Sequence, residues 1–197
     1  MLLGSDIILL QEAEGVRETQ QVYTTMSEHF HQLRRRFNLK NAAAARLGSD
    51  ELREKVSGLL VRYLDLQQHL AADNLEDARK DGTALMPLAE TVIAELESTG
   101  FDQASTLAGQ LTEDIRLLTK AATLEEIRSA FYPFSQTLAR IVETFGSNLE
   151  TPLYLQFCPM AFGNKGATWL APSEEINNPY FGAMMLRCGE VRQQISQ

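Results

Sequence analysis

The stretch TLEEIRSAFYPFSQTLARIVETF, residues 123–145, decides the fold class of this chain. Thr123 followed three residues later by Glu126 is a capping box, in which each side chain accepts a hydrogen bond from a backbone N–H that the first helical turn leaves free. Apolar side chains then recur every three or four residues, which places them on one face of a helix. They are Leu124, Ile127, Phe131, Phe134, Leu138, Ile141, Val142 and Phe145. The pattern predicts a long helix with one face in a core.

Three segments upstream carry the same periodicity. Ser49, followed by two acidic residues, is a typical helix start, and an apolar stripe follows it over residues 52–70. Residues 73–76 resemble the start of another helix, which we expect to end at Gly100, and a further helix is expected over about residues 101–122. Consecutive amphipathic helices joined by short turns predict an antiparallel helical bundle over residues 49–148.

The composition changes after this bundle, where proline and glycine become frequent. Residues 153–157 (LYLQF) predict a short strand, and residues 168–170 are expected to pair with it as a hairpin. Residues 178–182 (NPYFG) predict a turn that opens a short helix through Met184, Met185 and Cys188. The predicted fold class is therefore mostly α: an antiparallel helical bundle with a small irregular C-terminal segment (149–197), containing a short β-hairpin plus a short helix, packed on it.

Charge and motif content disfavour several classes of function. The formal net charge is -8, from 18 Lys and Arg against 26 Asp and Glu, which argues against nucleic acid as a partner. No apolar stretch approaches the roughly 20 residues that a transmembrane helix needs. We find no phosphate-binding loop, nucleophile elbow or zinc-protease helix, and we expect no enzyme activity. The N-terminus shows no secretory leader, so a cytoplasmic protein and a processed exported protein remain alternatives.

Sulfur chemistry is confined to the C-terminal segment. The chain has two cysteines, Cys158 and Cys188, and both lie in this segment. Each has a methionine nearby in the sequence. Cys158 and Met160 point to the same side of an extended backbone, and Met185 and Cys188 would share a helix face. Thiolate and thioether sulfur are soft ligands that suit Cu(I). The two pairs, if brought together, would supply up to four sulfur ligands.

Spacing alone leaves other readings open. The two cysteines could form a disulfide that staples the irregular segment, and cysteine and methionine are also ordinary core residues. A cytoplasmic thiol redox protein is a third reading, although the chain lacks the C-x-x-C arrangement that usually lowers a thiol pKa.

Several linked motifs resemble a known family. In the C-terminal segment they are residues 153–161 (LYLQFCPMA), 166–170 (GATWL), 175–182 (EINNPYFG) and 185–189 (MLRCG), and in the bundle 63–66 (YLDL), 70–73 (LAAD) and 127–131 (IRSAF). The chain is similar, over about residues 52–195, to the uncharacterised helical domain found stand-alone in secreted proteins and at the C-terminus of heavy-metal efflux periplasmic adaptors of the membrane-fusion class.

The resemblance implies a periplasmic or otherwise extracytoplasmic location, Cu(I) or Ag(I) as the bound metal, and efflux pump or adaptor components as partners. It places Cys158, Met160, Met185 and Cys188 at the family's sulfur positions, with Met184 as an additional candidate ligand. Trp169, Tyr180 and Phe181 would then wall the site. Phe157 stands where some relatives have a histidine, so no imidazole ligand is expected there. Residues 1–48 lie outside the match and are interpreted as an N-terminal linking helix, or as a remnant of the preceding adaptor region.

Overall fold

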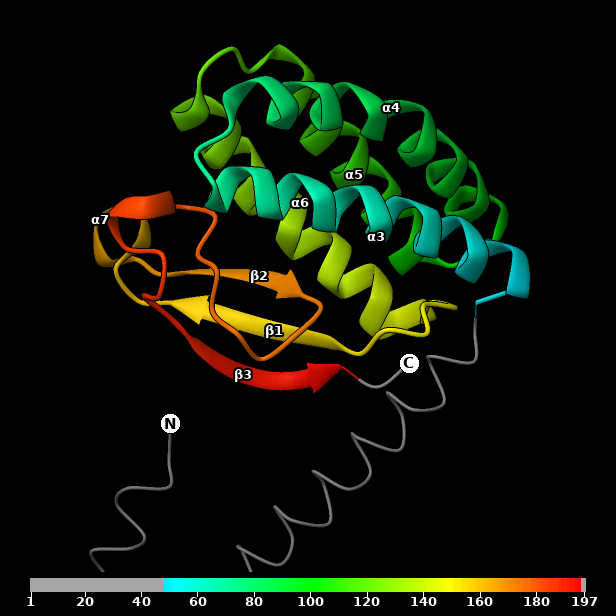
Figure 1. Cartoon of the computed structure of the whole chain (residues 1–197). Helices are drawn as coiled ribbons and strands as arrows, with labels where there is room; N and C mark the ends of the chain where they lie inside the picture. The colour runs from blue at the N-terminus through cyan, green and yellow to red at the C-terminus, as the bar shows by residue number, and fades with distance from the viewer. Residues whose placement is uncertain (1–47, 196–197) are drawn as a thin grey trace, which may run out of the picture. The chain divides into compact units, whose positions relative to one another are not determined.

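The computed structural model describes residues 48–195, in which four long helices pack against a small antiparallel sheet (Figure 1). The long helices are α3 (Asp50–Ala71), α4 (Leu75–Ser98), α5 (Asp102–Lys120) and α6 (Leu124–Phe145). Each contacts the next along the chain, and α3 also contacts α6. The predicted mostly helical fold with an antiparallel bundle is confirmed. The linking helix expected over residues 1–48 falls outside the described residues, except for residue 48 itself.

The helix starts follow local capping chemistry. The Ser49 hydroxyl accepts from the N–H of Leu52 at 3.0 Å, and both bonds of the Thr123–Glu126 capping box are present. The start of α4 differs from the prediction, because its cap is Asn74, whose side chain accepts from the N–H of Asp77 at 3.2 Å. Asp73 instead has a left-handed backbone, with φ of 55°, and its carboxylate faces another part of the chain. No helix of the described part of the chain is long and apolar enough to cross a membrane.

The sheet contains one more strand than the sequence predicts. The expected hairpin is formed by β1 (Leu153–Cys158) and β2 (Ala167–Ala171), which pair antiparallel and are joined through the short turn α7 (Ala161–Asn164). On the other side of β1 lies β3 (Glu190–Ile195), so the strand order is β2-β1-β3. All of β3 except Ile195 is exposed, which explains why its mostly polar sequence shows no apolar alternation.

The short helix predicted through Met184, Met185 and Cys188 is confirmed only at its start and does not extend past Met184. Only one 3₁₀ turn, η1 (Gly182–Met184), forms there, and the N–H of Cys188 donates to the carbonyl of Met185 at 2.9 Å in a separate turn. The physical reason is that backbone groups of this segment bond elsewhere. For example, the N–H of Asn178 donates to the Leu186 carbonyl at 2.8 Å.

A buried tyrosine joins the bundle to the sheet. The hydroxyl of Tyr63 in α3 lies 2.6 Å from the Ser135 hydroxyl in α6 and accepts from the N–H of Leu170 in β2 at 2.9 Å. Its ring stacks on Phe131 with centroids 5.0 Å apart. Burial raises the pKa of Tyr63 well above its usual range, so the hydroxyl stays protonated and uncharged. Helices and sheet therefore share one core.

Arg128 attaches the loop between β2 and β3 to the same bundle. Its guanidinium donates to the Leu70 carbonyl at 2.7 Å, to the Asp73 carboxylate at 2.6 Å and to the Pro179 carbonyl at 2.7 Å. Asp73 in turn accepts from the N–H of Ala183 at 2.8 Å. The hydrogen bond from Arg128 holds the pKa of Asp73 below its usual range. The family-like LAAD and IRSAF motifs thus contribute one ion pair that fixes the loop.

We expect Tyr63→Phe to lower the free energy of unfolding by about 1–3 kcal/mol, because it leaves the buried Leu170 N–H without an acceptor. Urea denaturation measures this value. Tyr132→Phe is the matched control, since its hydroxyl only accepts from the exposed Gln136 at 2.8 Å, and it should change stability by less than about 0.5 kcal/mol. Equal effects of the two substitutions would show that Tyr63 does not link sheet and bundle.

Candidate dithiol site

The structure brings the two cysteines together. The sulfur atoms of Cys158 and Cys188 lie 3.3 Å apart, and both residues are free thiols. Cys158 ends β1 and is completely buried, whereas Cys188 is partly exposed just before β3. The thiol pair is therefore reached from the solvent on the Cys188 side.

Strand pairing explains why residues so far apart in sequence meet. Phe157 pairs with Glu190, so the chain that enters β3 passes the end of β1, where Cys158 lies. Gly189 allows this close approach: a Cβ there would lie 2.9 Å from the Trp169 ring and 3.0 Å from the Phe157 carbonyl, and its φ of +153° also disfavours other residues.

Asn178 fixes the backbone of Cys188. Its side-chain amide donates to the Cys188 carbonyl at 2.7 Å, while its side-chain oxygen accepts from the N–H of Tyr180 at 2.8 Å and from that of Phe181 at 3.3 Å. Asn178 is fully buried, so each of these bonds is shielded from water. The NPYFG motif is thus the clamp that holds the second cysteine in place.

The methionines predicted as ligands lie close in sequence to the two cysteines, but they are not buried together with them. Met160 follows Cys158 by two residues and is 48% exposed, and Met184 is 81% exposed. Met185 is partly buried, and its carbonyl accepts from the N–H of Cys188. Within residues 48–195 no group of three or more His, Cys, Asp or Glu side chains could hold a metal ion. Among the described residues, the methionines therefore remain the side chains predicted to join the two thiols as ligands.

The aromatic residues expected to wall the site are buried to different extents. Trp169 is fully buried, and its ring meets that of Tyr180 edge-on with centroids 5.9 Å apart. The Tyr180 hydroxyl donates to the Thr168 carbonyl at 2.5 Å. Burial, with a smaller contribution from nearby Cys158, raises the pKa of Tyr180 well above its usual range. Phe181 is only partly buried and packs against the core.

Sequence reasoning missed Gln156, which lies on the same sheet face as Cys158. Gln156 pairs directly with Trp169 across β1 and β2, and its amide nitrogen donates to the carbonyls of Ser173 and Glu175 at 2.8 and 3.1 Å. Its side-chain oxygen and the indole N–H of Trp169 are both buried, and neither has a hydrogen-bond partner in the described part of the chain. Buried unpaired polar atoms are costly, so these two atoms are available to a partner on this face. The sequence carried a signal for Gln156, because a strand residue two positions before Cys158 lies on the same face of the sheet.

The thiol pair can bind a soft ion or be oxidised. The hydrogen bond with Cys158, followed by burial, raises the pKa of Cys188, so ion binding must displace protons from the pair. Disulfide formation would require the sulfurs, now 3.3 Å apart, to close by about 1.2 Å, to the S–S bond length of about 2.05 Å.

Comparison with known proteins gives one match. A family model described as "Protein of unknown function (DUF3347)" matches residues 59–150, from within α3 to just past α6. The matched region contains most of the bundle and ends before both cysteines. No curated protein and no solved structure matches the chain. The resemblance inferred from the sequence is thus supported at the level of an uncharacterised domain.

We expect Asn178→Ala to raise the reaction rate of Cys188 with Ellman's reagent at least about tenfold, because loss of its hydrogen bonds allows the segment to open more often. Absorbance of the released thiolate measures the rate. Asn177→Ala is the matched control, since that side chain only accepts from the exposed Arg187 at 3.2 Å, and its rate should stay within about twofold of the parent protein. Unchanged reactivity in Asn178→Ala would contradict the role of Asn178 as the clamp.

Proposed function

We propose that this chain is an extracytoplasmic accessory domain that binds Cu(I) or Ag(I) through the thiolates of Cys158 and Cys188. Met160 and Met185 complete the soft ligand set, with Met184 as an additional ligand. The observation that carries the proposal is the 3.3 Å separation of the two sulfur atoms, which come from opposite ends of the C-terminal segment.

The geometry needs little change to take an ion. Two thiolates on a tetrahedral metal, with bonds of about 2.3 Å, lie about 3.8 Å apart, so the sulfurs would separate by about 0.5 Å. Cys158 is held in the middle strand of the sheet, whereas Cys188 lies in a turn at the surface. Cys188 would therefore make most of the movement that separates the two sulfurs. Soft sulfur ligands favour Cu(I) and similar ions over hard cations such as Mg²⁺.

The exposed methionines suit delivery of the ion. A thioether is uncharged and needs no deprotonation, so it binds a soft ion without displacing a proton. Met160 and Met184 both face solvent, near in sequence to the two cysteines. They provide first contacts for an ion passing between solvent or a partner and the buried thiols. The domain thus holds and transfers an ion, and the proposal includes no catalytic step.

The resemblance of the C-terminal motifs to heavy-metal efflux adaptors supports the biological setting. In this proposal the partners are the adaptor and pump components of such a system, and the location is the periplasm or another extracytoplasmic space.

Titration of the reduced protein with Cu(I) against a chromogenic chelator tests the proposal. We expect the Cys158→Ser, Cys188→Ser variant to lose at least about 100-fold in affinity, or about 2.7 kcal/mol. Met160→Leu and Met185→Leu should each lose about three- to tenfold, since each removes one neutral ligand.

Met86→Leu is the matched control. Met86 is 43% exposed on α4, away from the C-terminal segment, and its loss should leave the affinity unchanged. Equal affinity in the parent protein and the double cysteine variant would refute metal binding at this site.

A second function is favoured by the burial of Cys158 and the short sulfur separation. In this alternative the two cysteines form a disulfide, and the stapled segment is part of a helical protein-interaction module without a metal. The crosslink would tie the end of β1 to the entry of β3.

Intact mass of protein purified without reductant separates the two functions. The disulfide alternative predicts a mass lower by two hydrogen atoms, unchanged by mild reductants and accompanied by no Cu(I) uptake. The metal proposal predicts free thiols after mild reduction and a mass increase by one metal ion on loading. A stable disulfide that resists mild reduction would decide for the interaction module.

A further inference from the structure

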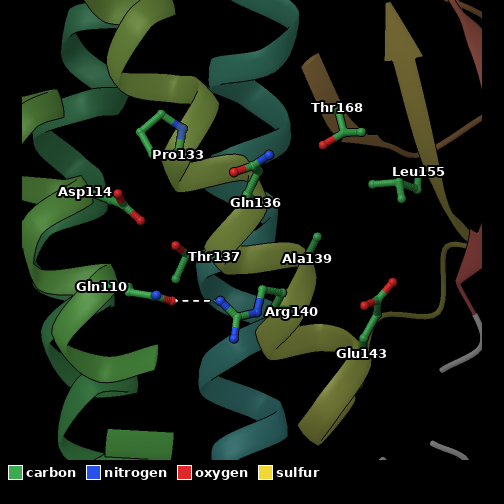
Figure 2. A pocket seen from close by; sticks show the side chains of 10 residues that line it. All are labelled: Gln110, Asp114, Pro133, Gln136, Thr137, Ala139, Arg140, Glu143, Leu155 and Thr168. Carbon is green, nitrogen blue, oxygen red and sulfur yellow. Dashed lines mark hydrogen bonds between the residues drawn. The ribbon is translucent and has the colours of Figure 1, made fainter. Parts of the chain in front are cut away.

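A groove over α6 lies apart from the thiol pair. Figure 2 shows it between α5 on one side and the sheet on the other, with a volume of about 480 Å³. Gln110 and Asp114 line it from α5, Thr137 and Arg140 from α6, and Leu155 from β1. Neither cysteine lines it. Its volume lies in the range typical of small-molecule pockets.

One carboxylate oxygen in this groove has no partner. Asp114 is only 5% exposed, and its Oδ2 atom makes no hydrogen bond in the described part of the chain. Its side chain points from α5 toward Thr137 (Figure 2). The Thr137 hydroxyl donates a hydrogen bond to the carboxyl group. Burial, the largest effect, raises the pKa of Asp114. An unpaired buried carboxylate is costly, and a cationic donor would relieve that cost.

The neighbouring charges do not satisfy Asp114. Arg140 donates to the side-chain oxygen of Gln110 at 3.1 Å, and Figure 2 shows this pair further along the helices than Asp114 and Thr137. The adjacent Glu113 raises the pKa of Asp114 further and is itself paired with Arg116. The groove therefore contains a buried carboxylate oxygen that has no cationic partner among the described residues.

The chemistry of the lining selects the class of ligand. Gln136 and Thr137 also line the groove, and their side-chain oxygens are neutral acceptors. Pro133, Ala139 and Leu155 provide apolar lining. Hard metal ions need about six oxygen ligands, which one carboxylate and a few neutral oxygens do not supply, whereas an ammonium group needs only three acceptors.

We infer that this groove is a second ligand site that binds a small organic molecule carrying a primary ammonium group. The ammonium donates to Asp114 Oδ2 and to neighbouring oxygens, and the alkyl part lies against Pro133 and Leu155. The site is independent of metal binding and of the state of the cysteines.

Titration of the full chain with n-butylammonium chloride, followed by ¹H–¹⁵N NMR, tests the inference. Saturable shifts are expected for the amides of Asp114 and Thr137 and their neighbours. n-Butanol, which lacks the charge, and tetramethylammonium, which lacks the N–H donors, should each bind at least about tenfold more weakly.

Two variants make the test specific. Asp114→Asn should weaken binding at least about tenfold, and Leu155→Trp, which fills the groove while keeping the carboxylate, should abolish it. Glu97→Gln is the matched control, because its side chain is exposed on α4 and does not line the groove, and it should leave the affinity unchanged. Shifts that do not saturate, or saturable binding that neither groove variant weakens, would overturn the inference.

Discussion

The hydroxyl group of Tyr63 is the constraint on which the C-terminal segment depends. It connects α3, α6 and β2 at one buried point, where it accepts from the backbone of Leu170 and lies within hydrogen-bond distance of Ser135. A sheet of three short strands with one mostly exposed edge buries too little apolar surface to be stable alone. Packing on the bundle through this contact gives β1 a fixed position, and β1 carries Cys158 into the core.

The thiol pair follows from that arrangement. Once β1 is placed, the pairing of β3 returns the chain to the end of β1. Arg128 holds the intervening loop against the bundle, and Asn178 fixes Cys188 within that loop. The two cysteines meet with one sulfur fully buried and the other accessible. This asymmetry is suited to an ion that enters from one side. The NPYFG motif contributes to it, because its Asn178 fixes the backbone of Cys188. The proposed metal function rests on this shared geometry.

Elements that depend on neighbouring residues could be predicted from the sequence. The Ser49 cap, the Thr123–Glu126 capping box and the β1–β2 hairpin were correct because the chemistry that forms them lies within a few residues. Elements that depend on distant contacts were not. Asp73 does not cap α4 because its carboxylate is held by Arg128, 55 residues away.

The same distinction applies to the sites. β3 was missed because an exposed edge strand needs no apolar face. The helix expected before it does not extend past Met184, because backbone groups there bond elsewhere, as the Leu186 carbonyl does with the N–H of Asn178. The motifs indicated that Cys158 and Cys188 act together, but the unpaired atoms of Gln156 and Trp169 become visible only in three dimensions. Asp114 had a usable signal, since it follows Leu111 by three residues on the apolar stripe of α5, where a charged residue is unexpected.

The central claim is that two thiolates from opposite ends of the C-terminal segment bind one soft metal ion. X-ray absorption at the copper K edge of Cu(I)-loaded protein tests it most directly. Our account predicts a first shell of sulfur atoms at about 2.3 Å that loses its two thiolate sulfurs in the Cys158→Ser, Cys188→Ser variant. A first shell of only nitrogen and oxygen atoms, or the same spectrum in that variant, would contradict it.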